Sequence, residues 1–140
     1  MKQKVLFVCI HNSARSQMAE AFLNKYGSDK FIAESAGIEP GTLNPLVVKV
    51  MAEKGIDISK NETKSVFDFV KQGKSYDIIV TVCDTEAAER CPVFPGKGMR
   101  LHWDFPDPSS VPGTESEKLV RIRPIRDAIE SKIKEFISST

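Results

Sequence analysis

The chain lacks the features that mark membrane proteins and nucleic-acid-binding proteins. Its longest apolar run, VLFVCI, is far shorter than the roughly 18 residues that a membrane helix needs. An excess of one charge is also absent, since 20 Lys and Arg residues stand against 19 Asp and Glu residues among 140. A net charge of +1 offers no basic surface to nucleic acid or anionic lipid. We therefore expect neither partner, and any anion specificity must come from a local site.

Cysteine is scarce, and the three that occur, Cys9, Cys83 and Cys91, are odd in number. An odd count does not suit a secreted disulfide scaffold, and the N-terminal apolar run is too short for a secretion signal. Reduced thiols in the cytosol fit better, so a cytoplasmic location is expected. The three side chains are then either reactive thiols or buried structural ones.

Apolar runs alternate with amphipathic segments, which predicts alternating strands and helices. Strands are expected in four apolar runs rich in β-branched residues: 4–10, 31–36, 76–83 and 99–103. Helices are expected where apolar residues recur at helical spacing: 13–26, 45–54, 65–71 and 115–138. Pro124 should kink or split the last helix, and 105–113 should be a loop. This order predicts a single α/β domain over 1–140, with a doubly wound parallel sheet flanked by helices.

The segment from Cys9 to Ser16 joins the first strand to the first helix. Backbone N–H groups there, together with the helix N-terminus, can cradle a tetrahedral oxyanion, and Arg15 can bind two of its oxygens. The same field favours the thiolate of Cys9, to which Ser16 can donate a hydrogen bond. Asn12 tolerates left-handed backbone angles and can pin the loop. The alternative is a buried cysteine that ends a strand, followed by an arginine without a specific role.

This strand–CxxNxxRS–helix arrangement resembles the low-molecular-weight tyrosine phosphatase superfamily, which includes the thioredoxin-coupled arsenate reductases. Similar segments follow along nearly the whole chain: VLFVC, NSARSQMAEAF, ESAGIEPG, EKGIDIS, VTVCD, CPVFPG, and HW followed by DP. The resemblance implies a four-stranded parallel sheet of order 2-1-3-4, with Cys9 as the nucleophile. It also implies an oxyanion-binding loop made of Ile10, His11, Asn12, Ser13, Ala14, Arg15 and Ser16.

The residues around Asp107 distinguish two activities within the superfamily. Asp107 matches the Asp of the superfamily's Asp-Pro pair, which acts as general acid, although alone it could equally cap a turn. Phosphatases of this group usually follow that pair with aromatic residues that grip a phosphotyrosine ring. Here Ser109 and Ser110 follow, and the chain has only two tyrosines, neither near this loop. A phosphotyrosine pocket is therefore poorly supported.

Cys83 and Cys91 match the second and third redox cysteines of the thioredoxin-coupled reductases, with a spacing of eight where some members have seven. The resemblance implies that Cys9 attacks arsenate and that Asp107 helps water leave. Cys83 then attacks Cys9, which releases arsenite, and Cys91 attacks Cys83. The resulting Cys83–Cys91 disulfide would be reduced by thioredoxin, while phosphate and sulfate would compete with arsenate. A weak phosphatase side activity could remain.

The segment 84–90, between the two later cysteines, is rich in helix formers. A helix there would separate the Cα atoms of Cys83 and Cys91 by about 12 Å, whereas a disulfide tolerates at most about 7 Å. We therefore expect oxidation to unwind this segment and to speed amide exchange across 84–92.

Some reductases of this family bind potassium through residues that match Asn12, Glu20 and Ser35, together with a later Asp. Lys64 occupies the corresponding place here, so neither potassium nor another metal is expected, and Lys64 could supply the positive charge itself. We expect no tightly bound cofactor, thioredoxin as the electron-donating partner, and a monomer. Two alternatives stay open: a low-molecular-weight tyrosine phosphatase whose extra cysteines protect Cys9, and a non-enzymatic thiol redox sensor.

Overall fold

The computed structural model describes residues 2–83, 89–91 and 98–139. Within these residues, four strands form one parallel sheet in the order β2-β1-β3-β4, which confirms the expected fold class. The strands are β1 (Gln3–Cys9), β2 (Phe31–Gly37), β3 (Ile78–Thr81) and β4 (Met99–His102). The helices are α1 (Arg15–Tyr26), α2 (Pro45–Ala52), α3 (Val66–Lys71), α5 (Glu115–Ser138) and a short 3-10 helix, η1 (Pro108–Ser110).

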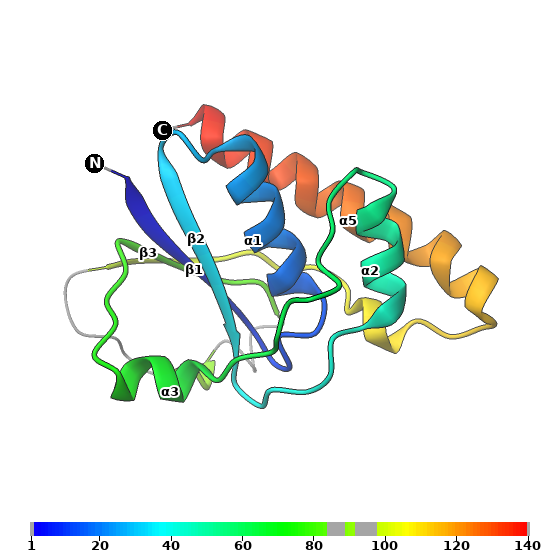
Figure 1. Cartoon of the computed structure of the whole chain (residues 1–140), viewed down its shortest axis with the longest axis horizontal. Helices are drawn as coiled ribbons and strands as arrows, with labels where there is room; N and C mark the ends of the chain where they lie inside the picture. The colour runs from blue at the N-terminus through cyan, green and yellow to red at the C-terminus, as the bar shows by residue number, and fades with distance from the viewer. Residues whose placement is uncertain (1, 84–88, 92–97, 140) are drawn as a thin grey trace.

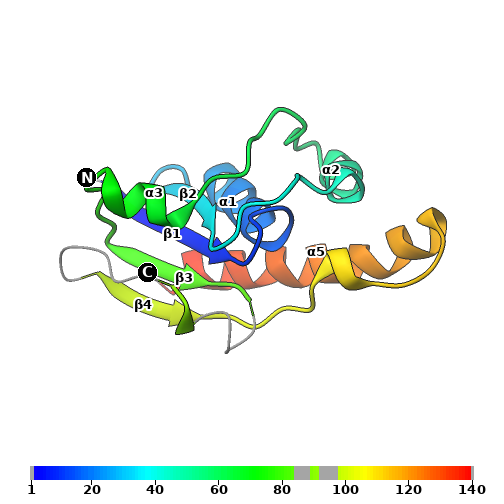
Figure 2. The ribbon, with the colours of Figure 1, turned by 90° about the horizontal axis from the view of Figure 1, so that it is seen from below.

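Helices cover both faces of the sheet (Figures 1 and 2). The face that carries α1, α2 and α5 is called the α1 face here, and the opposite face, which carries α3, is called the α3 face. Alternation along β1 divides the core between them. Val5, Phe7 and Cys9 join the apolar cluster of the α1 face, whereas Leu6 and Val8 join that of the α3 face.

The carboxyl ends of the inner strands meet at one edge of the sheet, where ligands bind in open parallel sheets. Cys9 pairs with Gly37 of β2, and Val8 pairs with Thr81 of β3. Continuing that register places Cys83 just beyond the end of β3, beside the end of β1. Gly37 is required here, because a Cβ atom at this position would lie 2.8 Å from the backbone nitrogen of Asn12.

Two elements differ from their sequence-based predictions. The third strand, expected over 76–83, covers only Ile78–Thr81. The last helix continues through Pro124 as one element, so the predicted split is wrong. Pro124 leaves only the carbonyl of Val120 without its helical partner, and Val120 is exposed, so water can replace that partner. A capping box at Thr114 stabilises the start of the helix, and a buried stripe that packs against α1 stabilises it along its length.

The remaining elements match their predicted ranges to within two or three residues. The loop predicted over 105–113 contains the single turn η1. The helix predicted over 84–90 lies mostly outside the described residues. No helix in the described part of the chain combines the length and the apolar character needed to cross a membrane.

Candidate active site

The loop after β1 folds back so that hydrogen-bond donors point at the sulfur of Cys9. The backbone nitrogen of Asn12 donates to Cys9 Sγ at 3.1 Å, and the hydroxyl of Ser16 lies 2.8 Å from the same atom. Asn12 has a left-handed backbone with φ of 55°, as its residue type allows. Cys9 is 3% exposed, so the protein itself supplies most of the polar contacts of its sulfur. Contacts of this kind stabilise negative charge on a nucleophile.

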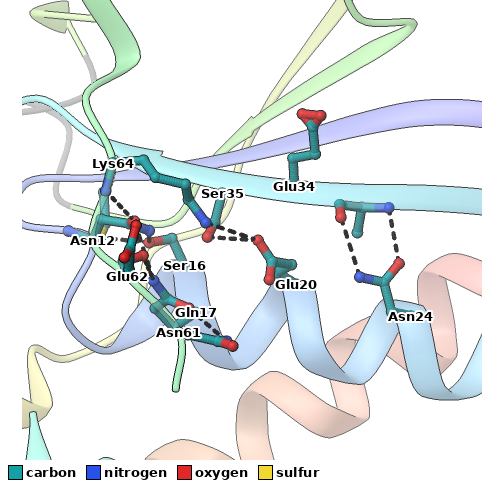
Figure 3. A network of polar contacts seen from close by, with 12 residues as sticks. Asn12, Ser16, Gln17, Glu20, Asn24, Glu34, Ser35, Asn61, Glu62 and Lys64 are labelled. Atoms are coloured by element: carbon teal, nitrogen blue, oxygen red, sulfur yellow. Dashed lines mark hydrogen bonds and ion pairs between the residues drawn. The ribbon is translucent and has the colours of Figure 1, made fainter. Parts of the chain in front are cut away.

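Asn12 determines which way the Ser16 hydroxyl points (Figure 3). The Asn12 amide nitrogen donates to Ser16 Oγ at 2.8 Å, while its amide oxygen accepts from the backbone nitrogen of Lys64 at 3.0 Å. Since Ser16 Oγ already accepts a hydrogen bond from Asn12, its own proton is available to Cys9. The chain of polarised bonds from Lys64 through Asn12 and Ser16 therefore ends on the sulfur of Cys9.

Segment 61–64 lies against the loop after β1 and is joined to the Asn12 and Gln17 side chains by hydrogen bonds (Figure 3). The Gln17 amide nitrogen donates to Asn12 Oδ1 at 3.2 Å and to the carbonyl of Glu62 at 3.0 Å. Asn61 donates to Gln17 Oε1 at 3.1 Å, and Gly37 donates its N–H to the Lys64 carbonyl at 2.7 Å. Sequence reasoning did not single out Gln17 or Asn61. Their signal was weak, since the two residues are 44 positions apart in the chain.

Lys64 also reaches Glu20 and Ser35, two of the residues for which the resemblance implied a potassium site (Figure 3). Its ammonium lies 3.5 Å from Glu20 Oε1, and the hydroxyl of Ser35 donates to that same oxygen at 2.8 Å. Lys64 therefore neutralises a carboxylate that is largely buried between α1 and β2. Among the described residues, no group of three His, Cys, Asp or Glu side chains could hold a metal ion.

Arg15 and Asp107 face each other above the loop. The Arg15 guanidinium is buried, donates to the carbonyl of Phe105 at 3.1 Å and lies 3.9 Å from Asp107 Oδ2. Asp107 accepts from the backbone nitrogen of Ser109 at 2.9 Å and from the hydroxyl of Ser110 at 3.0 Å, so it also caps η1. Its side chain remains 32% exposed, which leaves the carboxyl accessible at the edge of the loop.

The three cysteines are all buried thiols, but they belong to two different apolar clusters. Cys9 and Cys83 belong to the apolar cluster of the α1 face, whereas Cys91 belongs to the cluster of the α3 face. Burial raises the pKa of the Cys91 thiol, and the charge and hydrogen bond of Arg100 oppose that rise. Two of the three predicted redox residues therefore share one cluster of the core, and the third belongs to the cluster of the opposite face.

A parallel sheet of order 2-1-3-4 with a cysteine–arginine oxyanion loop at its carboxyl edge defines a class of phosphatase-like proteins. Residues 4–140 match the family model described as "Low molecular weight phosphotyrosine protein phosphatase", and the chain belongs to this family. An arsenate reductase of Bacillus subtilis is 44% identical over 97% of this chain and 96% of its own length.

Solved structures give the same family context. An arsenate reductase of Archaeoglobus fulgidus has a TM-score of 0.69 and 33% identity, and the match covers 96% of this chain and 98% of that one. A thioredoxin-dependent arsenate reductase of Corynebacterium glutamicum has a TM-score of 0.72 and 29% identity, covering 99% of this chain and 60% of that one.

Proposed function

We propose that this protein is an arsenate reductase that converts arsenate to arsenite through the thiols of Cys9, Cys83 and Cys91. The observation that carries the proposal is a second buried thiol, Cys83, at the same sheet edge as the nucleophile of the oxyanion loop. A phosphatase needs no second thiol there, whereas a reductase needs one that attacks Cys9 Sγ and forms a disulfide with it. The arsenate reductase names of the curated relatives, which align over nearly the full chain, support this choice.

The first step forms a bond between sulfur and arsenic. The loop and Arg15 hold the arsenate oxygens, and the thiolate of Cys9 attacks the arsenic atom. One arsenate oxygen leaves as water, with Asp107 as the source of a proton. Asp107 is accessible beside Arg15, which is where a leaving oxygen would need its proton.

The second and third steps are thiol–disulfide exchanges. The thiolate of Cys83 attacks Cys9 Sγ, the sulfur–arsenic bond breaks, and its electron pair reduces arsenic(V) to arsenic(III), which leaves as arsenite. The thiolate of Cys91 then attacks Cys83, so that Cys9 leaves as a thiolate and a Cys83–Cys91 disulfide remains. Reduced thioredoxin would return this disulfide to two thiols. The enzyme would act as a monomer in the cytoplasm.

Lys64 takes the place of a bound cation in this scheme. Its ammonium balances Glu20 beneath the loop and its backbone nitrogen orients Asn12, so one residue links local charge to the geometry around Cys9. The enzyme would then need neither potassium nor a tightly bound cofactor.

A phosphatase is the second candidate, because Arg15 and Asp107 are placed as hydrolysis of a phosphate ester would require. The residues after Asp107 argue against phosphotyrosine as the substrate, since Ser109 and Ser110 are engaged in capping η1 and offer no ring to stack on. Hydrolysis of small aryl phosphates would be a weak side activity.

Arsenite production with different reductants tests the proposal. Arsenate would be supplied with thioredoxin, thioredoxin reductase and NADPH, and in parallel with a glutaredoxin system or a low-molecular-weight thiol. We expect turnover with thioredoxin that is lost in Cys91→Ser, although that variant still hydrolyses a small aryl phosphate. Normal turnover by Cys91→Ser would contradict the relay. Fast aryl phosphate hydrolysis without arsenite formation, under any reductant, would favour the phosphatase.

A further inference from the structure

Cys91 rests in an apolar setting that suppresses its reactivity. Its side chain is 7% exposed and belongs to the α3-face cluster, which also includes Phe69 of α3, Ile79 of β3, and Tyr76 just before β3. Burial of this kind favours the neutral thiol, whereas only the thiolate attacks a disulfide. Something must therefore support the charged form if Cys91 is to act in an exchange near neutral pH.

Arg100 of β4 is placed to give that support. It pairs with Ile79 in the β3–β4 register, and paired residues of adjacent strands point to the same face of a sheet. Because Ile79 lies in the α3-face cluster, Arg100 projects onto the face that holds Cys91. A hydrogen bond from its guanidinium and its positive charge both lower the pKa of Cys91, against the larger effect of burial.

Among the described residues, the other ionisable groups of this face either have partners of their own or are exposed on α3. Tyr76 donates its hydroxyl to Glu34 at 3.0 Å, and Lys74 forms an ion pair with the same carboxylate. His102, two residues after Arg100, is hydrogen-bonded to Thr81 at 2.7 Å. Asp68 and Lys71 of α3 are exposed, and Arg90, next to Cys91 in the chain, pairs with Glu39. Among the described residues, Arg100 is the charged group that lowers the pKa of Cys91.

We propose that Arg100 is a positioning residue that holds Cys91 on the α3 face and stabilises its thiolate for the exchange with Cys83. The role within a relay rests on the proposed function. Cys91 releases its proton to solvent beside Arg100, its thiolate forms a new bond to Cys83 Sγ, and the Cys9–Cys83 bond breaks. Cys9 leaves with the electron pair as a thiolate, so the exchange causes no net oxidation or reduction.

The pH dependence of Cys91 alkylation tests Arg100 without arsenate. The wild type, Arg100→Met and Arg100→Lys would be labelled with iodoacetamide from pH 6 to 10, and each cysteine would be followed by peptide mass spectrometry. Met keeps the aliphatic cover of the arginine and removes its charge, whereas Lys keeps the charge. Arg121→Gln, an exposed arginine on the α1 face, is the matched control.

We expect the Cys91 profile of Arg100→Met to move to higher pH, with labelling slowed about tenfold per pKa unit below the plateau. The plateau itself should be unchanged, Arg100→Lys should restore most of the rate, and Arg121→Gln should match the wild type. Coinciding profiles of the wild type and Arg100→Met would overturn the proposal. Faster labelling of Arg100→Met at all pH values would also overturn it, because Arg100 would then only cover Cys91.

A single-turnover measurement links Arg100 to the relay. After arsenate is added without thioredoxin, the Cys9–Cys83 and Cys83–Cys91 disulfides would be quantified over time. Arg100→Met should slow the second disulfide relative to the first by the same factor as in the labelling, and an unchanged ratio would remove Arg100 from the relay. If the wild type forms no disulfide with arsenate, the proposed function fails, whereas the labelling result for Arg100 stands.

Discussion

The two faces of the sheet are built differently around their cysteines. On the α1 face, which α1, α2 and α5 cover (Figure 1), Cys9 and Cys83 belong to the apolar cluster, and the polar side chains of the loop after Cys9 are joined by hydrogen bonds (Figure 3). On the α3 face, the described helix that covers the cluster of Cys91 is the six-residue α3. A helix of this length has little stability of its own and depends on packing. The α1 face, with the proposed anion-binding loop, is thus built to stay in place, and the α3 face with Cys91 can change at lower cost.

The largest expected effect comes from replacing Cys9, the proposed nucleophile on the α1 face. Cys9→Ser should abolish both arsenate reduction and aryl phosphate hydrolysis, because both begin with attack by this sulfur. In the wild type, arsenate, phosphate or sulfate in the loop should slow alkylation of Cys9 and leave that of Cys91 unchanged. Loss of protection at Cys9, or equal protection of both thiols, would remove the distinction between the faces.

Asn12 gives the next largest effect, on stability and anion binding together. Asn12→Ala leaves buried donors without acceptors, at about 1–3 kcal/mol each, and strains a left-handed backbone by about 1–2 kcal/mol. We expect a total loss of about 3–8 kcal/mol in the free energy of unfolding, measured by urea denaturation. Asn12→Gly removes the strain and should be less destabilising by roughly 1 kcal/mol. Equal stabilities of the two variants would show that the left-handed backbone at this position carries no cost.

The geometry of the loop after Cys9 could be predicted from sequence because its determinants are local, whereas anion binding there stays a prediction. Cys9, Asn12, Arg15 and Ser16 lie within eight residues, and their spacing on a strand–loop–helix segment already indicates an anion cradle. The order of the sheet came from the resemblance, since alternating elements define a doubly wound sheet without giving the order of its strands. Lys64 could be singled out only through the resemblance, which implies a carboxylate at the corresponding place in some reductases.

The remainder depends on tertiary structure. The Gln17–Asn61 contact joins residues 44 apart, and the Arg100–Cys91 contact depends on the β3–β4 register. Neither has a signature along the chain. Pro124 shows the opposite problem, because a strong local rule predicted a kink or a split there, and the helix is not split: Ile122, Ile125 and Ile129 pack into the core on both sides of the proline. The resting place of Cys91 across the sheet was likewise invisible in its eight-residue spacing from Cys83.

Oxidation offers a direct test of the unequal faces. We expect a Cys83–Cys91 disulfide to draw Cys91 out of the α3-face cluster, because Cys83 belongs to the cluster of the other face and a disulfide holds its two Cα atoms within about 7 Å. Losing this small apolar side chain should weaken the cluster by about 1–2 kcal/mol and speed amide exchange in α3 about tenfold. Exchange in α1 and β1 should be unchanged. Similar acceleration on both faces, with the disulfide confirmed by mass, would contradict the comparison.

Lys64 should give a smaller, conditional effect. Arsenate turnover by the wild type should be the same in potassium and sodium chloride at equal ionic strength, because the ammonium already balances Glu20. Lys64→Asp would place a second carboxylate beside Glu20, so its turnover should fall several-fold and recover with potassium. Lys60→Asp, an exposed change in the same segment, is the control. Potassium dependence in the wild type would show that Lys64 does not replace the cation.

The smallest expected effect concerns the link between the two faces. Arg90, beside Cys91, pairs with Glu39, whose backbone nitrogen donates to the carbonyl of Ile10 in the oxyanion loop at 2.7 Å. Arg90 lowers the pKa of the Glu39 carboxyl, so the pair is complete above the ordinary range of a glutamate and weakens as pH falls through the lowered value. Both side chains are half-exposed, and exposed pairs contribute little.

Glu39→Gln should therefore raise the alkylation rate of Cys91 at pH 8 by no more than two- to threefold, because the residue before Cys91 loses one contact. Glu115→Gln, which removes an exposed ion pair with Lys49 on the α1 face, should leave that rate unchanged. A rate increase above tenfold would mean that this contact, rather than Arg100 and the apolar cluster, holds Cys91 in its resting place.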